Sequence, residues 1–125
     1  MPKAEKQNII ADKSFQFALD IIELDRKLTQ QREFILSKQV LKSGTSIGAN
    51  VEEAQAAQSK KDFVSKMSIA SKEARETRYW LRLLLESNLV TDNDGLLKVL
   101  FHDVDDLINI LTKIVKTSYF KMTKS

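Results

Sequence analysis

The sequence contains no cysteine, one proline and three glycines among its 125 residues. The absence of cysteine excludes disulfides, thiolate metal ligands and a cysteine nucleophile, and it suits a reducing cytoplasm. Proline and glycine break helices, so their scarcity favours long uninterrupted ones. No stretch approaches the roughly 20 apolar residues of a membrane-spanning helix, and the N-terminal residues lead into no apolar signal segment. We therefore expect a cytoplasmic protein with no membrane partner.

A strong excess of charge of one sign is also missing. The 20 Lys and Arg residues against 17 Asp and Glu residues give a net charge of +3. So mild an excess permits nucleic-acid binding but argues for it only where cations cluster on one surface. Hydrophobic residues make up 42% of the chain and charged residues 30%, the ordinary balance of a folded soluble domain. The length fits one domain with a substantial core.

Apolar residues recur with helical periodicity in four segments of the chain. Four long helices joined by short connections predict an all-α fold, an antiparallel up-down-up-down four-helix bundle over residues 12–117. Residues 1–11 are expected to form a flexible N-terminal arm, and residues 118–125 a C-terminal tail that frays. The four predicted helices cover about residues 12–28, 32–57, 59–88 and 96–116.

The middle of the second predicted helix, residues 43–50, has the composition of a loop. Apolar residues nevertheless keep one helical face across it, so we expect a continuous helix. Gly44 and Gly48 lie four residues apart on one side, where they would let a neighbouring helix approach closely. A polar stripe beside the apolar face fits either a small polar site or, as we favour, a hydrogen-bonding seam between helices at a subunit boundary. This stripe consists of Ser46, Asn50 and Glu53.

The first predicted helix carries two apolar stripes, whereas a helix on the surface of a monomer needs only one. One stripe consists of Phe15, Ala18, Leu19 and Ile22, and the other of Phe17, Ile21, Leu24 and Leu28. The third helix adds a second apolar patch, which consists of Tyr79, Trp80 and Leu83. Exposed apolar patches above a few hundred Å² are unusual on soluble monomers. We therefore predict that the chain forms a homo-oligomer.

A basic stripe lies within a narrow arc of the third helix. It consists of Lys72, Arg75, Arg78 and Arg82. Arginine suits phosphate because its planar fork donates two parallel hydrogen bonds, and repetition around an oligomer would strengthen the field of such a stripe. The commoner arrangement is a solvated face on which the arginines pair with carboxylates of the same helix, here Glu73, Glu76 and Glu86.

No catalytic, cofactor-binding or metal site is predicted. The Gly44–Gly48 run lacks the Gly-Lys-Ser/Thr ending of a phosphate-binding loop and follows no predicted strand. A di-metal site in a four-helix bundle needs Glu-x-x-His pairs, but His102 is the only histidine and Val99 stands three residues before it. His102 falls on the polar side of the last helix, where an exposed side chain is expected. We therefore expect a protein that is not an enzyme, with no cofactor and no small-molecule substrate.

Two motifs, residues 46–54 and 72–81, together with residues 59–63 between them, resemble the bacterial four-helix-bundle family of 23S rRNA intervening-sequence proteins. The resemblance covers about residues 15–111. It implies an antiparallel bundle that assembles into a homopentamer, often barrel-like with a central channel. It also implies similarity to the accessory variability protein of diversity-generating retroelements, a basic pentamer associated with nucleic acid and a reverse transcriptase. The family brings no catalytic residues.

Two functions fit these observations. The first is a cytoplasmic, pentameric scaffold that binds RNA or another nucleic acid through the repeated basic stripe. The second is a protein–protein interaction adaptor without nucleic-acid affinity, whose basic residues are merely solvated. The two hypotheses differ in whether the arginines of the stripe stay unpaired or bind carboxylates of their own helix.

Overall fold

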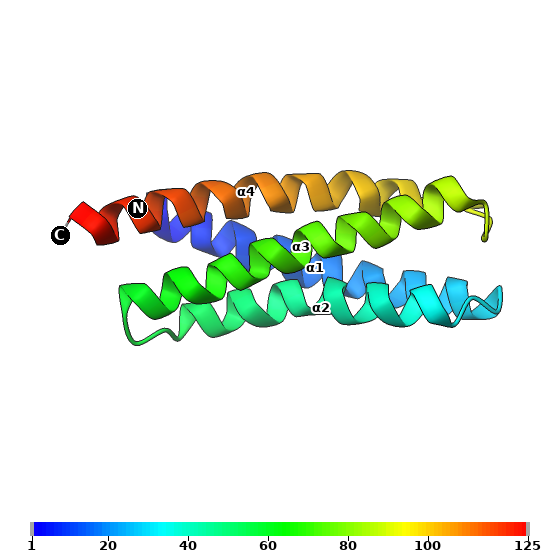
Figure 1. Ribbon diagram of the computed structural model, residues 1–125, viewed down its shortest axis with the longest axis horizontal. Helices are drawn as coiled ribbons and strands as arrows, with labels where there is room; N and C mark the ends of the chain where they lie inside the picture. The colour runs from blue at the N-terminus through cyan, green and yellow to red at the C-terminus, as the bar shows by residue number, and fades with distance from the viewer. Residues whose placement is uncertain (1, 125) are drawn as a thin grey trace.

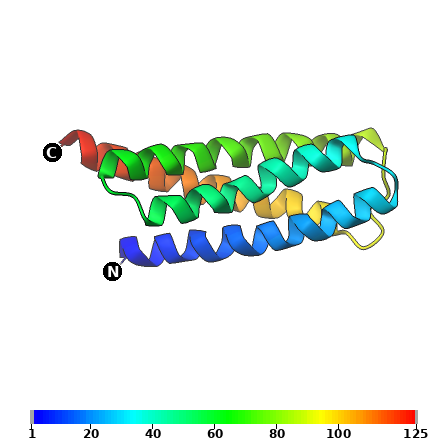
Figure 2. The same cartoon turned by 90° about the horizontal axis from the view of Figure 1, so that it is seen from below.

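The structure, a computed structural model, describes residues 2–124, and its side chains are described over residues 9–123. The described residues form four α-helices and no strand, which confirms the predicted all-α fold. The helices are α1 (Pro2–Gln30), α2 (Ile35–Gln55), α3 (Lys60–Ser87) and α4 (Leu96–Lys124). Each helix contacts the next along the chain, and α4 also contacts α1. Both chain ends and the α2–α3 connection lie at one end of the bundle, and the other two connections lie at the opposite end (Figures 1 and 2).

The first and last helices of the chain, α1 and α4, are longer than predicted. Helix α1 begins at Pro2, so residues 2–11 are helical where a flexible arm was expected, and α4 continues to Lys124 through most of the expected tail. Proline is well tolerated in the first turn of a helix, where its missing N–H has no partner to lose. Burial then favours the added turns, because Ile10 and Ser118 pack into the bundle. Met1 and Ser125, the ends of the expected arm and tail, lie outside the described residues.

One core of buried apolar side chains runs along the bundle and draws on all four helices. Full burial of a large aliphatic side chain contributes about 1.5–3 kcal/mol, and packing of this kind stabilises helices more than their intrinsic propensity does. The largest fully buried side chains include Ile10, Ile21, Leu28, Ile47, Met67, Leu81, Leu84, Leu100, Leu107 and Leu111.

Helix α2 is continuous through residues 43–50, as predicted, and it uses its two glycines to approach α1. A Cβ atom added at Gly44 would lie 2.8 Å from Cγ1 of Ile21, and one added at Gly48 would lie 3.3 Å from the backbone oxygen of Ser14. The prediction of a close helix contact at both glycines is therefore confirmed.

A buried pair of hydroxyl groups joins α2 to α3. The Oγ1 atom of Thr77 lies 2.9 Å from Oγ of Ser43 and 2.8 Å from the backbone oxygen of Glu73. Ser43 in turn donates to the backbone oxygen of Gln39 at 3.0 Å. Both hydroxyls are fully buried. Because an unpaired buried hydroxyl costs free energy, this pair stabilises one register of α2 against α3.

Side chains tie together the two connections at the end opposite the termini. Gln31 donates to the backbone oxygen of Thr91 at 2.9 Å and accepts from the Thr91 N–H at 2.7 Å. Lys27 forms an ion pair with Asp94, whose carboxylate also accepts from the Leu96 N–H. The hydrogen bond from Lys27 lowers the pKa of the Asp94 carboxyl, and the same bond raises the pKa of Lys27.

The glycine contact yields a stability prediction. Gly44→Ala gains up to about 1 kcal/mol of helix propensity, but overpacking against Ile21 costs about 1–3 kcal/mol, so we expect a net loss. In an Ile21→Ala background the added methyl group has room, and Gly44→Ala becomes neutral or stabilising. Denaturant unfolding of the four chains at one fixed concentration checks this cycle. Additive effects of the two substitutions would contradict the contact.

The Lys27–Asp94 pair yields a pH prediction. A carboxyl whose pKa is lower in the folded state stabilises that state above its unfolded pKa of about 3.9, and the contribution is lost as the pH falls through the lower folded value. Asp94→Asn keeps an oxygen for the Leu96 N–H but loses the charge. We expect a slightly lower melting temperature than the parent at neutral pH and a difference that closes in acid. A difference that persists in acid would show a lost cap rather than a lost ion pair.

Candidate interaction surfaces

Only one of the two predicted apolar stripes of α1 packs into the core. Phe17, Ile21, Leu24 and Leu28 are buried, so α1 turns that stripe toward the other three helices. On the opposite side, Phe15 is 66% exposed, Leu19 46% and Ile22 39%. Ala18, half-buried, lies beside them toward α2. We call Phe15, Leu19 and Ile22 the α1 outer face.

The apolar patch predicted on α3 is smaller than expected. Tyr79 is exposed, and its ring meets Trp80 edge to face at a centroid distance of 5.1 Å. Trp80, however, is half-buried against the core, and its Nε1 donates to the Glu76 carboxylate at 3.3 Å. Trp80 therefore contributes only part of its ring to the predicted patch, because the rest packs against the bundle core. Leu83 is half-buried and lines a shallow groove of about 200 Å³ with Tyr79, Arg82 and Glu86.

Arg78, in the middle of the basic stripe, is bound to α4 rather than to α3. Its Nε donates to the Asp105 carboxylate at 2.7 Å, and its guanidinium carbon lies 4.8 Å from the centre of the Phe101 ring. Neither Glu73 nor Glu76, which the sequence offered as partners, forms this pair. The guanidinium thus couples α3 to α4 through a charge pair and a cation–π contact.

The other three residues of the basic stripe differ in whether a carboxylate neutralises their positive charge. Arg82 donates to Glu86 at 2.6 Å along the same helix, and this hydrogen bond raises the pKa of the Arg82 guanidinium. Among the described side chains, Arg75 donates only to the neutral hydroxyl of Thr112, at 3.1 Å. Lys72 is exposed and makes no hydrogen bond or ion pair within residues 9–123. Unmatched positive charge therefore lies at the Lys72–Arg75 part of the stripe.

The polar stripe of α2 bonds within the chain. The side-chain nitrogen of Asn50 donates to the backbone oxygen of Ser46 at 2.9 Å and lies 3.1 Å from the Ser46 hydroxyl. Glu53 forms an ion pair with Lys66 of α3 at 3.7 Å. Only Glu53 therefore joins two helices, whereas the expected seam reduces to bonds inside α2 at the other two positions.

His102 is exposed, as predicted, with Asp103 and Asp106 close by on α4. Each of the three side chains offers one ligand atom, and these atoms lie within 4.8 Å of one another. The His102 side chain is 80% exposed, and it approaches Asp103 at 3.9 Å. The group is a set of solvated side chains on one helix face, an arrangement that is common without any ion.

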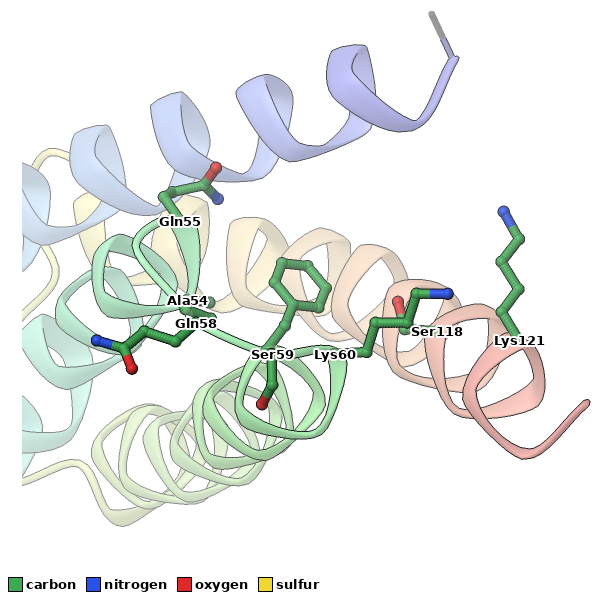
Figure 3. A pocket seen from close by; sticks show the side chains of 9 residues that line it. Ala54, Gln55, Gln58, Ser59, Lys60, Ser118 and Lys121 are labelled. Carbon is green, nitrogen blue, oxygen red and sulfur yellow. The ribbon is translucent and has the colours of Figure 1, made fainter. Parts of the chain in front are cut away.

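The structure also contains a pocket that the sequence analysis did not predict. It lies where the α2–α3 connection meets the C-terminal part of α4, and its volume is about 340 Å³ (Figure 3). Its wall mixes lysine, amide, hydroxyl and aromatic side chains: Ala54, Gln55, Ala57, Gln58, Ser59, Lys60, Phe63, Ser118 and Lys121. The sequence signal that could have located it is the run after Asp106, in which every charged residue is a lysine.

Comparison with known proteins agrees with the fold. Within the described residues, no helix combines the length and the hydropathy that a bilayer crossing requires. Residues 6–113 match the family described as 23S rRNA-intervening sequence protein. A protein of unknown function from the S23 ribosomal protein family of Bacteroides thetaiotaomicron VPI-5482 is 45% identical and superposes with a TM-score of 0.82, over 89% of this chain and 98% of that one. The comparison with curated proteins gave no match. The chain belongs to the 23S rRNA-intervening sequence protein family.

Proposed function

We propose that this protein is a non-enzymatic, homo-oligomeric scaffold, in which up-down-up-down antiparallel bundles assemble through the α1 outer face into a ring-like homopentamer. The observation that carries the proposal is the exposure of Phe15, Leu19 and Ile22 opposite the core stripe of the same helix. Large apolar side chains grouped on one face stabilise an assembly when a partner covers them. The family resemblance supports the proposed pentameric ring, and the composition supports the proposed cytoplasmic location.

The ligand we propose for the scaffold is RNA or another nucleic acid, held by the basic stripe of each subunit. Lys72 and Arg75 support this assignment because neither forms an ion pair within residues 9–123. Copies around a ring would add their fields and favour a polyanion over a small anion. A strand that passes along several subunits would meet one such pair after another.

A second candidate function is a protein–protein adaptor with no nucleic-acid affinity. The observation that favours it is the pairing of two of the three arginines. Arg78 is bound to Asp105 and Arg82 to Glu86. A polyanion would have to compete with these carboxylates for the two guanidinium groups.

The assembly is tested by the mass of the protein in solution. We expect light scattering at micromolar concentration to give a multiple of the 14.3 kDa chain mass, five-fold for the proposed ring. Leu19→Glu places a charge in the α1 outer face and should yield a folded single chain. Leu89→Glu, a change at an exposed residue of the α3–α4 connection, is the matched control and should remain assembled. A parent mass near that of one chain, or an assembled Leu19→Glu variant, would contradict the proposal.

Nucleic-acid binding is tested by filter binding across a salt series. If the basic stripe contacts phosphates, affinity should be sequence-tolerant and fall steeply with salt, since each neutralised phosphate releases counterions. Changing Arg75, Arg78 and Arg82 together to glutamine should remove most of the binding and leave assembly intact. Lys72→Gln with Arg75→Gln should reproduce most of that loss.

Two results separate the alternatives. The adaptor hypothesis expects the parent to show no more than the weak non-specific affinity of about 10⁻⁴–10⁻⁶ M at physiological salt. If the triple variant dissociates, the arginines are structural residues at a subunit boundary, and the loss of binding follows from the loss of assembly.

A further inference from the structure

We propose that the pocket between the α2–α3 connection and α4 binds one nucleotide unit, with its phosphate at Lys60 and Lys121 and its base against Phe63. The inference deepens the proposed nucleic-acid binding and rests on it for the class of partner. It names a surface different from the basic stripe, at the end of the bundle that carries both termini (Figures 1 and 3).

The segments of α3 and α4 beside the pocket carry more lysines than carboxylates. Helix α4 contains three aspartates up to Asp106, but residues 107–124 contain four lysines and no acidic residue. Lys60 and Lys61, both exposed, open α3 beside that stretch. The pocket therefore lies where two lysine-bearing segments meet, which favours an anionic ligand over a neutral one.

The pocket wall suits a ligand that is part anion and part aromatic ring. Lys60 and Lys121 come from different helices, and Figure 3 shows them on the same side of the pocket as Ser118. Phe63 and Ala57, both half-buried, supply apolar wall. Proteins that bind single strands combine lysines along the backbone with aromatic rings on which bases stack. A volume of about 340 Å³ lies at the small end of ligand pockets, large enough for one nucleotide unit and too small for a duplex.

Ser118 gives an independent sign that a polar ligand belongs here. It is only 7% exposed, and its hydroxyl donates to no acceptor within residues 9–123. Every fully enclosed side-chain nitrogen or oxygen of the described residues has a hydrogen-bond partner. The Ser118 hydroxyl is therefore reached from the pocket that it lines, and a ligand oxygen or nitrogen would satisfy it. Gln55 and Gln58, exposed at the opposite side, add amide donors and acceptors (Figure 3).

The test measures fluorescence anisotropy of a labelled oligouridylate of about 12 nucleotides, a length within the range bound by single-strand modules. Lys60→Gln with Lys121→Gln should lower the magnitude of the salt slope by about 1.4, the loss of two phosphate contacts on a single strand. Lys38→Gln with Lys98→Gln removes the same charge from exposed positions at the other end of the bundle and should leave the slope unchanged. Equal effects of the two pairs would overturn the proposal, because only net charge would then matter.

The aromatic contact has its own pair of variants. Phe63→Leu removes the ring and should weaken binding at least about fivefold, the lower bound for loss of one stacked base. Phe63→Tyr keeps the ring and should bind like the parent, which separates stacking from any change in folding; melting curves accompany both. A Phe63→Leu variant that binds like the parent would overturn the assignment of the base.

Competition distinguishes the source of the nucleotide. Displacement of the oligonucleotide by uridine monophosphate would show that the pocket takes a free nucleotide, and failure to displace would assign it to a nucleotide within a strand. Inorganic phosphate that competes as well as uridine monophosphate would overturn the nucleotide assignment.

The variants also show which of the two proposals fails. Binding that is lost in the arginine triple variant but kept when Lys60 and Lys121 are changed to glutamine would contradict the pocket proposal alone. No binding by the parent would sink both proposals.

Discussion

Helix α2 packs closely on α1 where its backbone at Gly44 meets the side chain of Ile21. A side chain at position 44 would have no room, since its first carbon would lie 2.8 Å from Ile21. Glycine thus lets α2 close on α1 and aligns the buried stripes of both helices, while the hydroxyl pair of Ser43 and Thr77 stabilises α2 against α3. With α2 on one side of α1 and α4 on the other, none of the four described helices covers the α1 outer face. Exposure of that face is a consequence of the packing.

Helical periodicity predicted what depends on local sequence and missed what depends on tertiary packing. The two stripes of α1 and the close approach at Gly44 and Gly48 followed from residue spacing and size. The ends of α1 and α4 could not be predicted from residue spacing. Residues 1–11 show little periodicity, and only the packed structure shows that Ile10 is buried. The partner of Arg78 could not be predicted either, because Asp105 lies 27 residues away in the sequence, on another helix. The pocket was missed for the same reason, since Ser118 and Phe63 line it from two different helices.

The distribution of charge gives the two ends of the bundle different properties. Aspartates cap and connect the end opposite the termini, where Asp92 accepts from the backbone of Leu97 and Asp94 binds Lys27. The end with the termini carries lysines on α3 and on the C-terminal part of α4. The net charge of the whole chain, +3, does not reveal this difference. The proposed nucleic-acid binding would therefore depend on which part of the surface is presented, and the proposed assembly through the α1 outer face would repeat that part in every subunit.

The chain contains no cysteine. A single introduced thiol can therefore measure whether another subunit covers the α1 outer face. A single thiol introduced as Leu19→Cys, or as Leu89→Cys for comparison, is the only one in its chain and reports the exposure of its own position. We predict that the thiol at position 19 reacts slowly with a thiol reagent at micromolar protein and faster on dilution, as assembly reverses, whereas the thiol at position 89 reacts at one rate throughout. Equal and concentration-independent rates at both positions would contradict the account.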